Sequence, residues 1–343
     1  MITEDRSMVI LKELAYNAIA KHSNKIFKRE AKVLEDKDPE ALHQMRVGMR
    51  RLRSALSQFT VAVNLPPIVT EKNIAKIGRS LGKLRDLDVL LAVLQDDYQP
   101  LLPADEQKKL AKIIKSINRK RKSELKQVRK TLNSKPYLNL KRELQNWLDN
   151  STYQKIGDCS VDLLLPDLLL PQVSQLLLHP GWLVGVEIVK GQIQLPQILD
   201  REAMEQIISS EDILLHGLRK SVKKTRYSLE LFDRFYGDNY HQYRDRIEQI
   251  QEILGQIQDT HILRKILERA LNSPISVKLP ELADLLLKIR YRKWLEWQVL
   301  QQQFLEGQIR EEFRQTIIQR SQRRSGSSSV VKSIDYKPST ANN

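Results

Sequence analysis

Hydrophobic residues recur every three or four positions along most of the 343-residue chain, which is the period of a helix with one buried face. The first such run covers residues 9–34. A second run begins behind Asp38 and Pro39, an N-cap residue followed by a residue suited to the first helical turn. Further helical runs occupy residues 72–97, 108–130 and 201–320. The pattern predicts an all-α protein.

Two segments depart from the helical period. Residues 158–198 are rich in Leu and Pro, and their last part alternates around Lys190 and Gly191 as a short β-hairpin does. Asp and Pro residues interrupt the most apolar part of this segment, so the sequence predicts no membrane-spanning helix of roughly 20 apolar residues. From residue 321 the chain is polar and rich in Ser, which predicts a disordered tail.

The basic stretch LHQMRVGMRRLRSAL at residues 42–56 has a counterpart, LHGLRKSVKKTRYSL, at residues 215–229. At the same offset of 173 positions LGKLRDLDVLL aligns with LGQIQDTHILR, which pairs Gly82 with Gly255 and Asp86 with Asp259. Self-similarity of this length indicates a duplicated helical unit, and we expect two pseudo-symmetric antiparallel helical bundles. The expected parts are a first bundle at 1–157, an insert or connector at 158–200, a second bundle at 201–320 and the tail at 321–343.

The charged positions of both basic stretches lie beside an apolar stripe. On a helical wheel of about 100° per residue, Arg46, Arg50 and Arg53 fall within roughly 80° of arc next to His43. The adjoining arc carries Leu42, Met45, Met49, Leu52 and Leu56. The second stretch repeats this arrangement with His216, Arg219, Lys223 and Arg226. Charges that border a core are expected to line a cleft, where an anionic ligand would relieve repulsion between neighbouring cations.

Composition limits the partner and the compartment. Lys and Arg number 57 against 42 Asp and Glu, which gives a formal charge of +15 and a pI near 9.7. Such a charge favours an anionic partner: nucleic acid, an acidic membrane or a phosphate polymer. The single cysteine, Cys159, excludes an internal disulfide framework, and the N-terminus lacks the basic start and apolar core of a signal peptide. These features predict a cytoplasmic location.

The motifs DPEALHQMRVGMRRLRSAL and LGKLRDLDVLL, with their degenerate second copies, resemble the CHAD domain, a helical domain named for its histidine-containing motifs. The resemblance covers roughly residues 8–320. It implies two four-helix bundles around a basic central cavity that binds inorganic polyphosphate and can target proteins to polyphosphate granules. The polyphosphate-binding residues it implies are His43, Arg46, Arg50, Arg51 and Arg53, their counterparts His216, Arg219, Lys223, Lys224 and Arg226, and the neighbouring Lys220. Arg79, Lys83 and Arg85 on the next helix would extend the basic wall, although Arg85 has an equal alternative in ordinary surface pairing with the nearby Asp86 or Asp88.

The second half departs from this pattern at two positions. Gln258 stands where the first half has Arg85, and His261 stands where it has Asp88. Whether the later helix of the second half contributes to the site is therefore left open. Asp86 is expected to orient one of the arginines rather than to act as an acid or a metal ligand.

Two further features each have a structural and a functional interpretation. His43 and His216 either bond to backbone or carboxylate groups at a packing edge or face the anion. In the second case their pKa values should rise above the unperturbed ~6.5, and binding should tighten as the pH falls towards about 6. Residues 108–130 carry eleven basic residues against Glu124 alone, which suits either a solvated face or an outer contact surface for the anion.

Three function classes fit a basic helical protein. Nucleic-acid or general polyanion binding is the principal alternative, although Tyr227 is the one aromatic platform for base stacking within the two basic stretches. A phosphohydrolase would need carboxylates around Mg²⁺, and the basic stretches contain none; Walker, zinc and serine-hydrolase motifs are absent as well. We predict a non-enzymatic protein that binds polyphosphate without a cofactor, a metal or catalytic residues, in an oligomeric state that the sequence leaves open.

Overall fold

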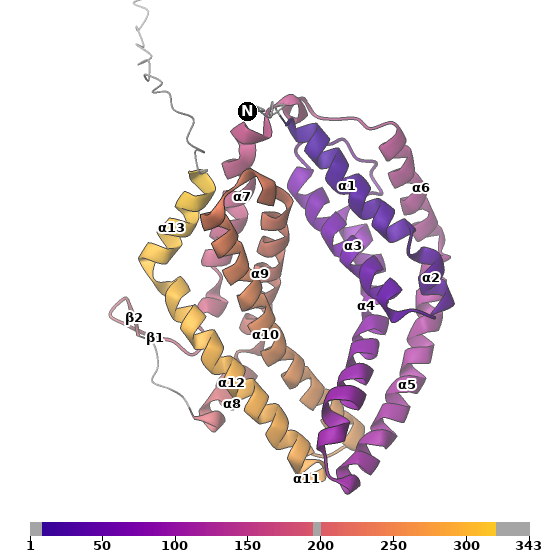
Figure 1. Cartoon of the computed structure of the whole chain (residues 1–343), viewed down its shortest axis with the longest axis vertical. Coiled ribbons are helices and arrows are strands. Elements are labelled where there is room, and N and C mark those ends of the chain that lie inside the picture. The colour runs from indigo at the N-terminus through magenta and orange to yellow at the C-terminus, as the bar shows by residue number, and fades with distance from the viewer. Residues whose placement is uncertain (1–8, 195–199, 320–343) are drawn as a thin grey trace, which may run out of the picture.

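The computed structural model describes residues 9–194 and 200–319, which are helical apart from one short hairpin (Figure 1). The first half contains α1 (Leu11–Phe27), α2 (Glu30–Glu35), α3 (Pro39–Phe59), α4 (Glu71–Ala92), α5 (Ala104–Leu132) and α6 (Lys135–Asp149). The second half contains α7 (Val161–Leu177), β1 (Glu187–Val189), β2 (Gln192–Gln194), α8 (Arg201–Ser210), α9 (Asp212–Phe232), α10 (Asp238–Leu271), α11 (Ile275–Lys278), α12 (Pro280–Leu305) and α13 (Gly307–Ile318). The all-α class is confirmed; the predicted tail lies outside the described residues.

The sequence signal for the start of α3 is confirmed. Asp38 accepts a hydrogen bond from the backbone N–H of Glu40 at 2.9 Å, and Pro39 takes the first helical position. The first predicted helical run, by contrast, divides into α1 and α2. Periodicity does not reveal this break, because the buried Ile26 and Val33 on either side of it keep a seven-residue spacing.

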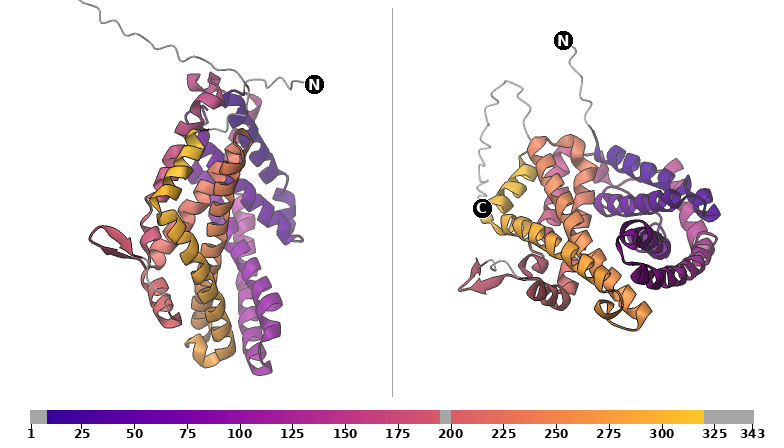
Figure 2. Two further views of the ribbon diagram at one scale, coloured as in Figure 1. Left: turned by 60° about the vertical axis from the view of Figure 1, so that its left-hand side comes forward. Right: turned by 60° about the horizontal axis from the view of Figure 1, so that its bottom comes forward.

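The two halves join where α3 meets α9 (Figures 1 and 2). Helix α3 also packs against α1 and α4, and α9 packs against α7 and α10. At the junction the buried rings of Phe59 and Phe232 lie 5.7 Å apart, edge to face. The two rings occupy equivalent positions in the predicted repeat, and one hydrophobic core runs through both halves at this level. This contact fixes how the basic stretches of α3 and α9 lie relative to each other.

A second hydrophobic core joins the far ends of the two halves. It combines the end of α4 and the start of α5 with α10, α11 and α12. Glu106 on α5 is 2% exposed, and its carboxylate accepts hydrogen bonds from the backbone N–H groups of Glu281 (2.9 Å) and Leu282 (3.2 Å) at the start of α12. A carboxylate is favourable there because it satisfies free N–H groups and faces the positive end of the helix dipole.

Glu106→Ala should lower the free energy of unfolding by about 2–4 kcal/mol, because it leaves two buried N–H groups without their charged acceptor. Chemical denaturation followed by circular dichroism measures this change. Asp105→Ala is the matched control, since Asp105 is an exposed neighbour paired with Lys109 and should leave stability nearly unchanged. Equal unfolding midpoints for the two variants would contradict a role for Glu106 in joining the halves.

Helix α7 continues through Pro166 and Pro171, although the sequence pattern suggested interruptions there. Each proline removes one backbone donor from the helix. Leu165, Leu169 and Val173 are fully buried on this helix, which packs against α9 and α13, and this burial offsets the lost hydrogen bonds. The segment expected to be an insert or connector therefore contains a core helix.

Residues Val161–Leu183 form the one segment of the described ranges that is long and apolar enough for a membrane-crossing helix. Length and composition alone are weak evidence for a span, because core helices meet the same test. The segment runs as α7 followed by a 3-10 turn, η4 (Pro180–Leu183), and the buried face of α7 belongs to the main core.

The predicted β-hairpin is confirmed. Strands β1 and β2 pair antiparallel, with Glu187 opposite Gln194. Lys190 and Gly191 form the connecting turn with φ values of 51° and 79°, the left-handed conformation that a two-residue hairpin turn requires. The hairpin projects from the body of the protein (Figure 2).

Candidate functional site

Helices α3 and α9 bring five of the predicted site residues together in what we call the central basic cluster: Arg46, Arg50, Arg219, Lys223 and Arg226. Burial lowers the pKa of Lys223 to about 7, and Arg50, Arg219, Arg46 and Arg226 act in the same direction. Burial alone disfavours the charged form of a lysine, and neighbouring cations add to this effect. Cations from both halves therefore share one site.

Two aspartates border the central basic cluster at equivalent positions of the predicted repeat. Asp86 on α4 lies 3.5 Å from Arg46, and Asp259 on α10 lies 3.6 Å from Arg219. Burial raises the pKa of Asp259, Arg219 opposes the shift, and Asp86 adds to it, so the two carboxylates lie close enough to act on each other. Asp259 thus lies among enough protein atoms to be partly desolvated, but the Asp86 and Asp259 side chains are 74% and 68% exposed and both remain in contact with solvent. The predicted pairing of Asp86 with an arginine is present.

Arg50 and Lys223 have no carboxylate within 4.0 Å in the described ranges, although both side chains are partly buried. Arg50 lies over the ring of Tyr227 at 5.9 Å, and its Nε is buried without a hydrogen-bond partner. Arg226 lies over the same ring at 4.7 Å and is bonded to Glu230 and to Glu248 (2.9 Å). The cluster thus contains three arginines that lie beside carboxylates and two cations, Arg50 and Lys223, that do not.

Two glycines of the repeat give the arginines room. A Cβ atom at Gly82 would lie 2.6 Å from Nη1 of Arg46, and one at Gly255 would lie 3.4 Å from Nη2 of Arg219. Gly82 and Gly255 occupy equivalent positions of the predicted repeat, but the sequence does not explain why glycine is found there. The structure supplies the reason: each arginine passes over its glycine towards the aspartate one turn further along the helix.

Gly82→Ala should weaken binding of an anion to the cluster about fivefold, or about 1 kcal/mol, because the new methyl group displaces Arg46. Helix propensity favours alanine, so the fold should not be destabilised. Gly78→Ala is the control, since its Cβ would lie 3.8 Å from Sδ of Met49, an ordinary contact. Titration with polyphosphate measures both variants; equal affinities would mean that the position of Arg46 is unimportant.

Known proteins resemble this chain in sequence and in fold. The sequence matches the profile of the CHAD domain over residues 17–268. The chain belongs to the CHAD domain family. It is similar to the crystal structure of the CHAD domain from the plant Ricinus communis, with 23% identity, a TM-score of 0.54 and coverage of 90% of this chain and 92% of that chain. It is also similar to PptA from Streptomyces chartreusis, with 13% identity, a TM-score of 0.56 and coverage of 91% and 100%.

No curated protein matches the chain. At these identities the two solved structures establish the fold. Membership of the CHAD domain family indicates a polyphosphate-related function at the level of the family.

The two motif histidines border the cluster. Burial lowers the pKa of His43, and Arg85 acts in the same direction, followed by the smaller effects of Arg50 and Arg46. The rise expected for a histidine that faces a bound anion is not present in the ligand-free protein, because burial and neighbouring cations act on His43 instead. The Nδ1 atom of His216 is buried without a hydrogen-bond partner.

The remaining predicted site residues are less closely gathered. Arg51 points towards α1 and pairs with Glu230 at 3.1 Å, and Arg53 lies 3.9 Å from Glu71. Arg85 joins the surroundings of His43 and Arg46. The following residues are exposed and have no ion pair in the described part of the chain: Arg79, Lys83, Lys220 and Lys224.

The two positions where the second half departs from the first have different surroundings in the two halves. Nη1 of Arg219 donates a hydrogen bond to Oε1 of Gln258 at 3.5 Å. Gln258 therefore helps to orient an arginine of the cluster and adds no cation of its own. Asp88 of the first half binds Nε of Arg121 at 2.6 Å. Its counterpart His261 is 5% exposed, and burial lowers its pKa.

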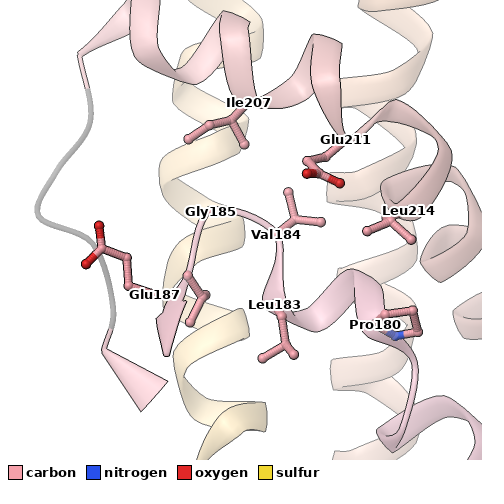
Figure 3. Close-up of a pocket in the computed structure, with 9 residues that line it drawn as sticks. Pro180, Leu183, Val184, Gly185, Glu187, Ile207, Glu211 and Leu214 are labelled. Atoms are coloured by element: carbon pink, nitrogen blue, oxygen red, sulfur yellow. The ribbon is translucent and has the colours of Figure 1, made fainter. Parts of the chain in front are cut away.

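The molecule also has a pocket of about 450 Å³ between η4, α8 and α9 (Figure 3). Its lining is mainly apolar, including Leu183, Ile207 and Leu214, with the carboxylates of Glu187 and Glu211 at its edge. No basic side chain lines it. An anion would be repelled by this pocket, so it is not a candidate for the family's ligand.

Proposed function

We propose that this CHAD domain binds inorganic polyphosphate at the central basic cluster, with cations of both halves contacting one chain. The gathering of cations from α3 and α9 carries the proposal: Arg50 and Arg226 lie over the same ring of Tyr227, and both act with Arg46 and Arg219 on the partly buried Lys223, whose pKa burial lowers. Holding like charges together destabilises the ligand-free protein, and a polyanion removes that repulsion. Arginine offers paired donors that match phosphate oxygens, and lysine adds a mobile point charge.

A ligand without bases fits the cluster better than a nucleic acid. Tyr227 is the aromatic side chain beside the cations, but it is 7% exposed and lies between two guanidinium groups. A base therefore has no free ring on which to stack. A phosphate chain needs only positive charges spaced along its path. Nucleic acid remains the alternative partner that an experiment must separate from polyphosphate.

We further propose that the protein holds polyphosphate without cleaving it and associates with polyphosphate granules through this binding. The two aspartates nearest the cations each lie beside an arginine, which suits orientation of that arginine. Among the described residues there is no group of three or more His, Cys, Asp or Glu side chains that could hold a metal ion. Steady release of orthophosphate from polyphosphate by pure protein, with Mg²⁺ present, would overturn this part of the proposal.

A competition experiment tests the ligand. Labelled long-chain polyphosphate is bound to pure protein at two salt concentrations and challenged with single-stranded RNA or duplex DNA at equal phosphate concentration. We expect neither nucleic acid to displace the polyphosphate, and affinity to fall steeply with salt as counter-ions are released. Ready displacement by RNA would favour the nucleic-acid alternative.

A further inference from the structure

A second basic feature lies on α5, outside the central basic cluster. Six cations, which we call the outer basic row, follow one another at spacings of four and three residues: Lys108, Lys112, Lys115, Arg119, Lys122 and Lys126. A spacing that averages 3.6 residues equals the repeat of the α-helix and keeps all six side chains on one face. At 1.5 Å per residue the row is about 27 Å long.

The outer basic row faces solvent. Helix α5 buries its opposite face against α4 and the two cores, through residues such as Leu110, Ile114 and Val128. On a wheel of about 100° per residue, the row is centred roughly opposite these core positions. Figure 1 shows α5 along the outer side of the first half, with α4 between it and the second half. The row therefore points away from the central basic cluster.

The row carries an uncompensated charge. All six side chains are exposed, and in the described ranges none has a carboxylate within 4.0 Å. Between Lys108 and Lys126 the helix contains one acidic residue, Glu124. A solvated face normally mixes both signs of charge, because like charges three and four residues apart destabilise a helix. An unbroken row of one sign is typical of a surface that contacts a polyanion.

The chemistry of α5 selects the kind of polyanion. The helix contains no aromatic residue, so it offers nothing on which bases could stack. Its apolar residues are engaged in the cores, so it lacks the exposed apolar face by which an amphipathic helix enters a membrane. The positions between the cations include small side chains such as Ser116 and Ser123, which leave a chain free access to them. An extended phosphate chain meets all these conditions.

We propose that the outer basic row is a second polyphosphate-binding surface, which contacts parts of a long chain that extend beyond the central basic cluster. This inference rests on the proposed function of the cluster. A long chain bound at the cluster reaches the row at a high effective concentration, so the two surfaces together bind more tightly than either one. A short chain cannot contact both. The protein therefore prefers long polyphosphate to short polyphosphate.

The test compares long-chain and short-chain polyphosphate over a series of salt concentrations. The row variant is Lys112→Gln/Lys115→Gln/Arg119→Gln/Lys122→Gln, in which every substituted side chain is exposed, so the fold should be kept. We expect its affinity for long chains to fall about tenfold or more and its salt slope to decrease by about 3, since each lost phosphate contact removes about 0.7–0.9. Affinity for short chains should change less than about twofold, because they bind at the cluster.

The matched control removes four exposed cations elsewhere: Lys72→Gln, Lys155→Gln, Arg269→Gln and Arg292→Gln. It changes the net charge equally and should keep the wild-type preference for long chains. If the row variant and this control bind long chains with the same affinity and slope, the proposal is wrong. It is also wrong if the row variant loses affinity for single-stranded RNA as strongly as for polyphosphate, because the row would then be a nucleic-acid surface.

The Arg50→Ala/Lys223→Ala variant separates the two proposals. Both proposals are supported if this variant loses short-chain binding and the row variant loses its preference for long chains. If the Arg50/Lys223 variant binds short chains normally while the row variant loses long chains, the cluster is not the binding site, and the row binds long chains by itself and not as an extension of the cluster.

Discussion

Replacing Arg50 and Lys223 together with alanine is expected to weaken polyphosphate binding by at least about 100-fold, because each substitution removes a charge-assisted contact worth about 1.5–3 kcal/mol. The two residues are equivalent in the repeat, one on α3 and one on α9, and neither is neutralised by a carboxylate in the described ranges. An equilibrium titration with labelled polyphosphate at fixed salt concentration measures the effect.

Lys155→Ala/Arg269→Ala is the control for this variant, since both residues are exposed cations outside the cluster and the net charge falls by the same amount. It should bind within about twofold of the wild type. Thermal unfolding provides a second control. The Arg50→Ala/Lys223→Ala protein should be no less stable than the wild type without ligand, because the substitution removes repulsion between cations. A double variant that binds as tightly as the control would exclude the cluster as the site.

Affinity for polyphosphate should fall as the pH rises above about 7, by up to about tenfold per pH unit, with Lys223 as the titrating group. Burial and the four neighbouring arginines lower the pKa of Lys223 to about 7 without ligand, and Asp259 is the carboxylate that also acts on it. A bound polyanion stabilises the ammonium form, so the pKa is higher in the complex and binding takes up a proton. Titrations at a series of pH values measure this dependence.

Lys223→Arg is the control for the pH dependence, because a guanidinium keeps its charge over this range. Its affinity should vary much less with pH. If the wild type and this variant show the same slope, other groups such as His43 carry the dependence.

The same pKa shift makes a prediction for the ligand-free protein. The folded-state pKa of Lys223 lies below the ordinary value of 10.5, so the unfolded chain binds more protons between the two values. Stability of the ligand-free protein should therefore rise with pH from about 7 towards 10.5, and Lys223→Met should remove this rise. Thermal unfolding over that range measures it.

The repeat in the sequence predicted which residues would come together better than it predicted their protonation. Arg46 lies beside Asp86 and Arg219 lies beside Asp259. The two aspartates occupy equivalent positions of the predicted repeat. The sequence left two interpretations of His43 open, and the lowered pKa of His43 in the ligand-free protein depends on burial and on Arg85, which only packing brings near. Arg51 belongs to the same basic stretch as Arg50 but pairs with Glu230, since a neighbouring position on a helix points in another direction.

The sequence by itself determined the all-α class, the start of α3, the hairpin turn and the family, because these depend on local periodicity, capping, turn residues and motifs. The tertiary structure decided that α7 passes through two prolines, since burial in the core offsets the lost hydrogen bonds. It also decided which cations share a site. Arg50 and Lys223 are far apart in the chain, and only the packing of α3 on α9 makes Arg50 a neighbour that helps to lower the pKa of Lys223.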